Sequence, residues 1–158
     1  KLDGGTGYYL QFSAEGLMVA AGYYWMAKDQ LQRFRDAVVA DGTGAEIEAL
    51  VADAKRANYD VGAIDELKSA PRGYDKHHPR IELIRRKGLM LSKNFGVPKW
   101  LHTKQVEKKV RETWAGAGEV CAWLDDEPSP VVTEDYRITG AVSCGYQHGL
   151  ALSVAGRV

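Results

Sequence analysis

The chain has little cysteine, no long apolar run and no net charge. Two of its 158 residues are cysteine and neither lies in a CxxC pair, so we expect no disulfide framework and a cytoplasmic, reducing location. The longest uninterrupted apolar run, residues 17–21, is far shorter than the ~20 residues that cross a bilayer. No basic segment followed by an apolar stretch opens the sequence. We therefore expect neither secretion nor a membrane partner.

Charge is balanced overall but unevenly distributed. Residues 68–111 carry thirteen Lys or Arg against three Asp or Glu, whereas residues 41–66 and 112–135 are mainly acidic. Such blocks pair within one fold, face water, or leave a basic face for an anion, and we favour the first two. The candidate anion-binding residues are Arg85, Arg86, Lys87 and Lys108. No helix-turn-helix or RNP-like motif accompanies them, so nucleic acid is not the expected partner.

The first 25 residues predict a β-hairpin. Apolar side chains alternate over residues 8–12 and again over 17–21, and Gly16 ends a connection of hairpin length. The second strand is apolar on both faces, which is typical of a central strand. The sequence opens with Lys1 and offers no earlier strand, so we expect a domain that is incomplete at its N-terminus. The aromatic residues beside the hairpin are expected in the sheet core: Tyr8, Tyr9, Tyr23, Tyr24 and Trp25.

Helical periodicity dominates the middle of the chain. Helices are predicted over residues 27–41 and 45–57, separated by Gly42 and Gly44, with Thr43 as the cap of the second. A short strand is expected at 58–61 and a longer one at 89–95. A helix over 103–124 is expected to divide near Gly116 and Gly118. The composition changes after residue 127, so we assign one domain to residues 1–127 and an uncertain tail to residues 128–158.

The segment "PRGYDKHHPRIELIRRKG", residues 71–88, is the densest in chemical groups. Pro79 suits the first position of a helix, which we expect to end with residues 85–87 and a Gly88 cap. Asp75 lies close enough to the two histidines to orient an imidazole as a general base. The favoured alternative is that these side chains only tie down the loop. Adjacent histidines diverge on either backbone, so we expect no metal.

Two further motifs lack their structural context. "GGTG", residues 4–7, precedes a strand instead of following one, unlike a dinucleotide fingerprint. "AVSCG", residues 141–145, has the shape of a nucleophile elbow with His148 nearby, but the chain is too short there for the strand–turn–helix that an elbow needs.

The chain resembles a bacterial family of conserved hypothetical proteins, the domain of unknown function 2461. The resemblance runs through three blocks in order, residues 7–38, 71–95 and 110–124. The positions that carry the resemblance are Gly7, Tyr8, Tyr9, Gly22, Tyr23, Leu31, Arg35, Arg72, Gly73, Tyr74, Asp75, His78, Pro79, Trp123 and Leu124. The family usually has helices and a strand before the Tyr-rich strand, and the tail after residue 127 does not match it.

The resemblance implies an α+β fold, with an antiparallel sheet packed against several helices, and it implies no reaction and no cofactor. It makes Arg72, Tyr74, Asp75 and His78 the candidate ligand-binding residues, because these are motif positions. The leading hypothesis is a binding or accessory protein that takes a small-molecule ligand at this polar site. The first alternative is an enzyme in which Asp75 orients His78 as a general base, and the second is the anion binder described above.

Overall fold

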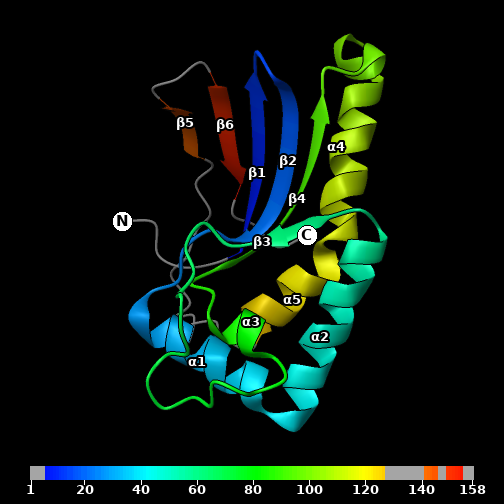
Figure 1. Ribbon diagram of the computed structural model, residues 1–158. Helices are drawn as coiled ribbons and strands as arrows, with labels where there is room; N and C mark the ends of the chain where they lie inside the picture. Colours follow the sequence, from blue (N-terminus) through cyan, green and yellow to red (C-terminus); the bar gives the residue numbers. More distant parts are fainter. Residues whose placement is uncertain (1–5, 127–140, 146–148, 155–158) are drawn as a thin grey trace.

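The computed structural model describes residues 6–126, 141–145 and 149–154 (Figure 1). These residues form an antiparallel sheet whose strands lie in the order β3-β4-β2-β1-β6-β5. The strands are β1 (Gly7–Ser13), β2 (Gly16–Tyr23), β3 (Asp60–Gly62), β4 (Leu89–Gly96), β5 (Ala141–Gly145) and β6 (Gly149–Val154).

The helices gather at one end and along one face of this sheet (Figure 1). They are α1 (Lys28–Val39), α2 (Asp41–Arg56), α3 (Ile81–Ile84), the 3₁₀ helix η1 (Lys99–His102), α4 (Gln105–Gly116) and α5 (Gly118–Asp126). The predicted α+β class and the antiparallel sheet are therefore confirmed. In the described part of the chain, none of the helices combines the length and the apolar character that crossing a membrane requires.

The predicted hairpin forms, and its second strand is central as expected. Tyr8 pairs with Ala21 across β1 and β2, and β4 pairs with the other edge of β2. The other edge of β1 pairs with β6, from Phe12↔Leu150 to Tyr8↔Val154, so a later segment of the chain supplies this partner. Of the tail expected from residue 128 onward, β5 and β6 add two strands to the sheet, and the remainder lies outside the described residues.

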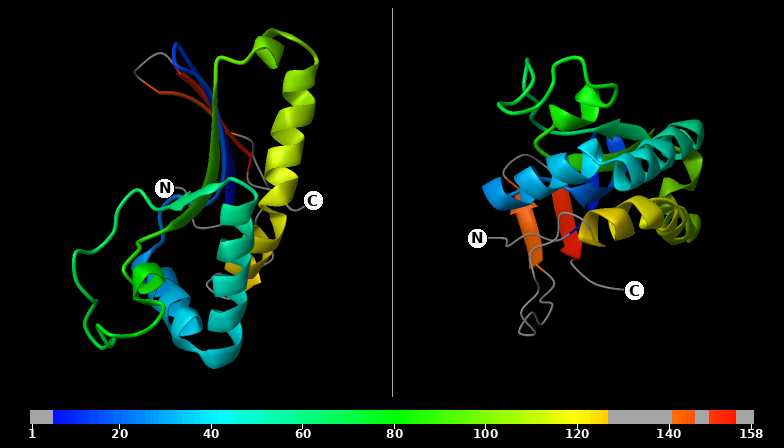
Figure 2. Two further views of the ribbon diagram at one scale, coloured as in Figure 1. Left: turned by 45° about the vertical axis from the view of Figure 1, so that its right-hand side comes forward. Right: turned by 90° about the horizontal axis from the view of Figure 1, so that it is seen from below.

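The two faces of the sheet differ in what covers them. Leu17 and Val19 of β2 are fully buried against Leu101 of η1 and Val110 of α4, so these side chains mark the helix-covered face. Figure 2 shows α4 lying along that face. Successive side chains of a strand point to opposite faces, so Met18 points to the other face. Near the β1–β2 turn, no helix among the described residues covers that other face, which we call the open face.

The main core lies where the helices meet the lower half of the sheet. Phe34 of α1, Ile47 of α2, Ile84 of α3 and Leu124 of α5 are all fully buried and pack together with the ends of β2 and β4. The helix predicted over 103–124 divides at Ala117 into α4 and α5, as expected from its glycines. The division lets α5 turn under the sheet and deliver its apolar stripe to this core.

A polar contact ties the far end of α5 to the start of β1. The Thr6 hydroxyl donates to Asp125 Oδ2 at 2.6 Å, and the Thr6 backbone N–H donates to Oδ1 at 3.1 Å. We call this contact the Thr6–Asp125 clasp. Thr6 is buried, so the carboxylate satisfies two donors that water does not reach easily.

Two helix boundaries differ from the prediction. The second helix begins at Asp41, so Gly42 and Gly44 lie inside its first turns, and Thr43 does not cap it but donates its hydroxyl to Ala37 O at 2.7 Å. The helix after Pro79 is one turn long instead of continuing to Lys87. The backbone beyond it leaves the helix because it bonds to another segment, through Leu67 N to Arg85 O and Lys87 N to Asp65 O.

The aromatic cluster is only partly core. Tyr23 is buried, and Tyr8 packs against Trp114 with ring centroids 5.5 Å apart. Tyr24 and Trp25 are instead 62 % and 65 % exposed, so the expectation that they belong to the sheet core is wrong. The strand ends at Tyr23, and the chain then turns away toward α1.

Candidate functional site

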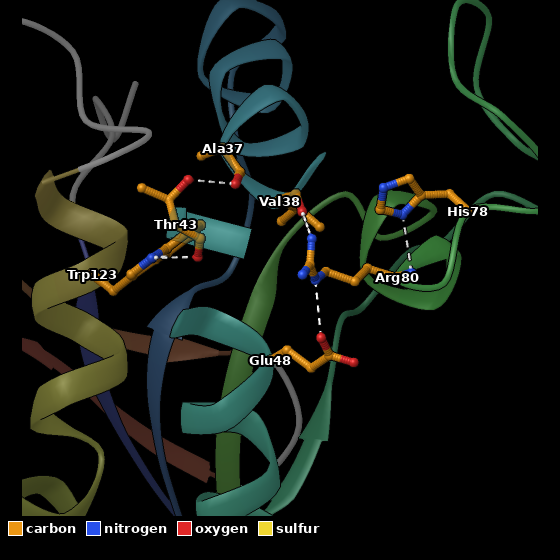
Figure 3. A network of polar contacts seen from close by, with 7 residues as sticks. All are labelled: Ala37, Val38, Thr43, Glu48, His78, Arg80 and Trp123. Atoms are coloured by element: carbon orange, nitrogen blue, oxygen red, sulfur yellow. Dashed lines mark hydrogen bonds and ion pairs between the residues drawn. The ribbon is translucent and has the colours of Figure 1, made fainter. Parts of the chain in front are cut away.

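The second half of the 71–88 segment builds a polar network at the corner between α1 and α2 (Figure 3). His78 Nδ1 accepts a hydrogen bond from the Arg80 backbone N–H at 3.0 Å. The Arg80 side chain is 13 % exposed and donates from Nε to Glu48 Oε2 at 3.0 Å and from Nη1 to Val38 O at 3.3 Å. Arg80 therefore neutralises a carboxylate on α2 and satisfies a free carbonyl near the end of α1.

The same corner receives α5 from the other side. Trp123 Nε1 donates to Thr43 O at 3.2 Å, beside the Thr43 bond to Ala37 (Figure 3). A Cβ at Gly44 would lie 2.2 Å from Val38 O and 2.6 Å from Arg80 Nη1, so a side chain there cannot coexist with this arrangement. The network thus needs glycine at residue 44, and it joins α1, α2, α5 and the loop before α3.

The first half of the segment contacts α1 instead. The Tyr74 hydroxyl donates to Asp36 Oδ1 at 2.7 Å and accepts from Gln32 Nε2 at 2.6 Å. Burial, followed by the hydrogen bond to the Asp36 carboxylate, raises the pKa of Tyr74 to about 12. Tyr74 is therefore a neutral phenol at any ordinary pH, and it fixes the 71–75 loop against one face of α1.

The side chains of three predicted site residues, Tyr74, Asp75 and His78, bond to separate partners. Asp75 Oδ1 accepts from His77 N at 2.9 Å, which closes a local turn, and the His78 ring is bonded to Arg80 as described above. Both bonds lead away from the pairing that a carboxylate-oriented base needs. Arg72 and Asp75 are exposed, Tyr74 and His78 are half-buried, and the enzyme hypothesis stays a prediction.

The predicted anion-binding set is also divided. Arg85 bonds to Glu82 at 3.3 Å, and Lys87 bonds to Asp65. Lys108 lies on α4, where it faces Glu112 at 3.7 Å, away from the α3 segment. Three of the four cations therefore already have acidic partners, in line with the internal pairing that the alternating charge blocks suggested.

Arg86 differs, and so does a residue that sequence reasoning did not select, Arg35. Nε and Nη1 of Arg86 and Nη2 of Arg35 are buried and have no hydrogen-bond partner among the residues that the structure describes. Burial lowers the pKa of both guanidinium groups, opposed at Arg86 by Glu66 and Glu82 and at Arg35 by Tyr74. Arg35 Nε donates to Ile84 O at 2.9 Å, so its side chain crosses from α1 to α3.

We call the region around α3 that contains Arg35, Arg86 and the Tyr74 beside Arg35 the arginine site. Both arginines adjoin α3: one bonds to its last residue, and the other follows it closely in the chain. Arg35 could have been noticed from the sequence, because it is a position of the family pattern and lies outside the apolar stripe of its helix. The burial of Arg86 has no sequence signal, since its neighbours are equally basic.

A family model described as a conserved hypothetical protein (DUF2461) matches residues 1–123. The chain belongs to this family. The match covers β1–β4 and α1–α4 and ends at Trp123, whose indole completes the corner network, so that network lies within the DUF2461 part of the chain. Neither the curated proteins nor the solved structures gave a match.

The DUF2461 domain also carries a small, partly open hollow of about 100 Å³ on the open face of the sheet. Gln11, Met18 and Asn94 form a row across β1, β2 and β4, since Gln11 pairs with Met18 and Met18 with Asn94. The β1–β2 turn closes one end with Ser13, Glu15 and Gly16. We call it the open-face hollow; sequence reasoning missed it because its lining depends on the register of three strands.

The remaining motifs add no site. Within the described residues, no group of three or more His, Cys, Asp or Glu side chains is arranged to hold a metal ion. Residues 141–145 form strand β5, and residues 146–148, which include His148, lie outside the described residues. Residues 4 and 5 of "GGTG" lie outside them too.

Proposed function

We propose that this DUF2461 domain is a binding protein whose ligand is a small oxyanion, a phosphate or a carboxylate, held at the arginine site. The observation that carries the proposal is the set of buried guanidinium nitrogens on Arg35 and Arg86 that have no partner within the described part of the chain. Arginine matches the oxygens of both ligand classes in charge and in geometry.

The energetic argument follows from burial. A buried donor without an acceptor costs about 1–3 kcal/mol, and more when the group is charged. An oxyanion offers several acceptor oxygens and a full negative charge, so binding would remove this cost at more than one nitrogen. Neighbouring cations such as Arg85 and Lys87 already bond to carboxylates, whereas the buried nitrogens of Arg35 and Arg86 keep their hydrogens for a further acceptor.

The Tyr74 contact supports the same location. It holds the 71–75 loop, which contains the exposed Arg72, on α1 next to Arg35. We propose that Tyr74 and Arg72 form the rim, and that His78 and Asp75 act from outside it by fixing the loop. The general-base alternative has less support, because the His78 and Asp75 side chains are bonded elsewhere. A cytoplasmic location is part of the proposal, since Cys121 is free and buried.

Calorimetry and thermal unfolding of the whole chain test this function. Inorganic phosphate and citrate are added separately, each against sodium chloride of equal ionic strength. A ligand at a hundred times its dissociation constant stabilises the folded protein by about 2.7 kcal/mol. We expect one of the two anions to raise the melting temperature of the wild-type protein, and the one that does so identifies the ligand class.

Arg86→Met is the decisive variant, and Arg111→Met is its matched control. Arg111 is an exposed arginine on α4 that pairs with Glu107, so its removal lowers the net charge equally without touching the arginine site. We expect Arg86→Met to fold and to lose the anion-dependent stabilisation, while Arg111→Met keeps it. Equal responses of the two variants, or no response of the wild-type protein to either anion beyond chloride, would overturn the proposal.

A further inference from the structure

The open-face hollow has a hydrogen-bonding pattern that points to a second ligand. Asn94 Oδ1 accepts from Gly96 N at 3.0 Å, and Ser13 Oγ accepts from Glu15 N at 3.2 Å. Gln11 Oε1 accepts from the Tyr9 hydroxyl at 2.8 Å. In each of these side chains the oxygen accepts a bond from the protein, so the amide or hydroxyl hydrogens of three residues that line the hollow remain as its donors.

The register of the sheet is what brings these donors together. Gln11 and Asn94 lie on either side of Met18 in one row of the open face. The Met18 thioether therefore has one side-chain amide on each side. A β-bulge between Leu17 and Met18 changes the pairing with β4 and aligns Asn94 with this row. Gly16 allows the turn to approach β4, because a Cβ there would lie 1.8 Å from Gly96 O.

Glu15 adds a hydrogen-bond acceptor at the rim of the hollow. Its exposed carboxylate lines the hollow, accepts hydrogen bonds and repels anions. A ligand that fits must accept from amide and hydroxyl donors, donate to a carboxylate, carry no negative charge and lay an apolar patch on Met18. Sugar and polyol hydroxyls both donate and accept, and their C–H groups give the apolar patch.

We propose that the open-face hollow binds a neutral polyhydroxylated small molecule, a sugar or a polyol, through the side-chain donors of Gln11, Ser13 and Asn94. This site is separate from the arginine site and does not depend on the oxyanion function. The hollow is small and partly open, so we expect dissociation constants on the order of 1 mM.

Two isosteric variants remove the donors and keep the bonds inside the protein. Gln11→Glu still accepts from Tyr9, and Asn94→Asp still accepts from Gly96, but each replaces an NH₂ group by an oxygen. Gln105→Glu, at an exposed position at the start of α4, is the control with the same chemical and charge change. Unchanged melting temperatures establish that all three variants are folded.

Nuclear magnetic resonance of the ¹⁵N-labelled full chain measures binding at the side-chain NH₂ signals of Gln11 and Asn94. The probes are maltotriose, cellotriose and myo-inositol, with glucuronate as the charged comparison. We expect at least one neutral probe to give saturable shifts at both signals, and glucuronate to bind more weakly. A lost hydrogen bond of about 1.4 kcal/mol corresponds to tenfold weaker binding, so we expect Gln11→Glu and Asn94→Asp each to weaken the probe roughly tenfold.

The result that overturns the inference is equally specific. Either none of the three neutral probes produces a saturable shift at Gln11 and Asn94, or the two hollow variants bind as well as Gln105→Glu. Arg86→Met separates this test from that of the oxyanion function: it should leave the neutral-probe shifts unchanged while abolishing the response to phosphate or citrate.

Discussion

Arg80 and Arg86 belong to the same basic segment and play opposite parts in the molecule. The Arg80 side chain is almost buried and meets a carboxylate and a backbone carbonyl. Arg86 is also largely desolvated, yet two of its nitrogens meet no acceptor in the described residues. Arg80 therefore stabilises the fold through its hydrogen bonds, whereas two nitrogens of Arg86 can still donate to a ligand.

This difference shows that a basic cluster cannot be assigned as a unit. Residue 80 and residues 85–87 are all basic, but the backbone turns from a single helical turn into an extended pairing with residues 65–67. That change of backbone directs successive side chains to different surroundings. Substitutions can test whether the corner network around Arg80 contributes more to stability than the arginine site does.

Gly44→Ala should have the largest effect, because it places a methyl group where Val38 O and Arg80 Nη1 lie. We expect a loss of roughly 3 kcal/mol in the free energy of unfolding, measured by urea denaturation. Gly42→Ala is the matched control in the same helix. It meets no atom within 4 Å and should be neutral or stabilise by about 0.5 kcal/mol through helix propensity. Similar losses for both variants would show that the corner is not tightly packed.

The two arginines are compared directly by Arg80→Met and Arg86→Met. Arg80→Met removes the partner of Glu48 and of Val38 O, and we expect about 2 kcal/mol of destabilisation. Arg86→Met removes desolvated donors that have no acceptor in the described structure, so its effect should lie within about 0.5 kcal/mol of zero or be stabilising. Chemical denaturation at low and high salt measures both. A larger loss for Arg86→Met than for Arg80→Met would refute the comparison.

Tyr74→Phe should alter the stability at alkaline pH. The pKa of Tyr74 is raised to about 12 in the folded protein and is near 10 in an unfolded chain, so the folded state holds the proton more tightly. The resulting stabilisation is fully present below pH 10 and is lost as the pH rises toward 12. We expect the variant to lose about 1 kcal/mol at pH 8 and to show a shallower decline above pH 10.

The measurement for Tyr74 is the denaturation midpoint as a function of pH, with Tyr24→Phe as a control at an exposed tyrosine. Some decline should remain in the variant. Burial also raises the pKa of Tyr8, Tyr59 and Cys121, so these groups lose stability in the same direction as the pH rises. An unchanged alkaline slope in Tyr74→Phe would mean that its hydroxyl is not held as described.

Substitutions of His78 test a single hydrogen bond of the corner network. His78→Ala removes the acceptor for the Arg80 backbone N–H, which should cost about 1 kcal/mol. His78→Asn supplies a side-chain oxygen at a similar position and should restore the stability to within a few tenths of a kcal/mol. Thermal unfolding of both variants distinguishes a structural acceptor from a base. Failure of asparagine to restore stability would show that the imidazole has a further role.

Local sequence rules predicted much of the fold but less of the site. The hairpin, the strand at 89–95 and the division of the last helix at Ala117 follow from alternation, turn residues and glycine positions. The start of α2 was missed because helix propensity places glycine outside a helix, whereas packing against Val38 and Arg80 requires it at residue 44. Tyr24 and Trp25 were misplaced because composition does not reveal where a strand leaves the sheet.

The candidate sites depend on contacts between distant residues. The predicted residues Tyr74 and Arg86 belong to the arginine site, but their neighbours come from α1 and from the 65–67 segment. The open-face hollow needs the pairing of β1, β2 and β4, including a bulge. Sequence spacing within one element does not show which distant residues come into contact, and Asn94 was not selected in advance for this reason.

The Thr6–Asp125 clasp bears on the order in which the chain assembles. Its two residues are 119 positions apart in the chain. Closing this loop therefore costs a large amount of chain entropy before the two hydrogen bonds can stabilise the structure. We expect the clasp to form after the hairpin and the α1–α2 pair, on the downhill side of the folding barrier. Asp125→Ala would then leave the refolding rate almost unchanged and raise the unfolding rate. The clasp therefore slows the unfolding of the native protein.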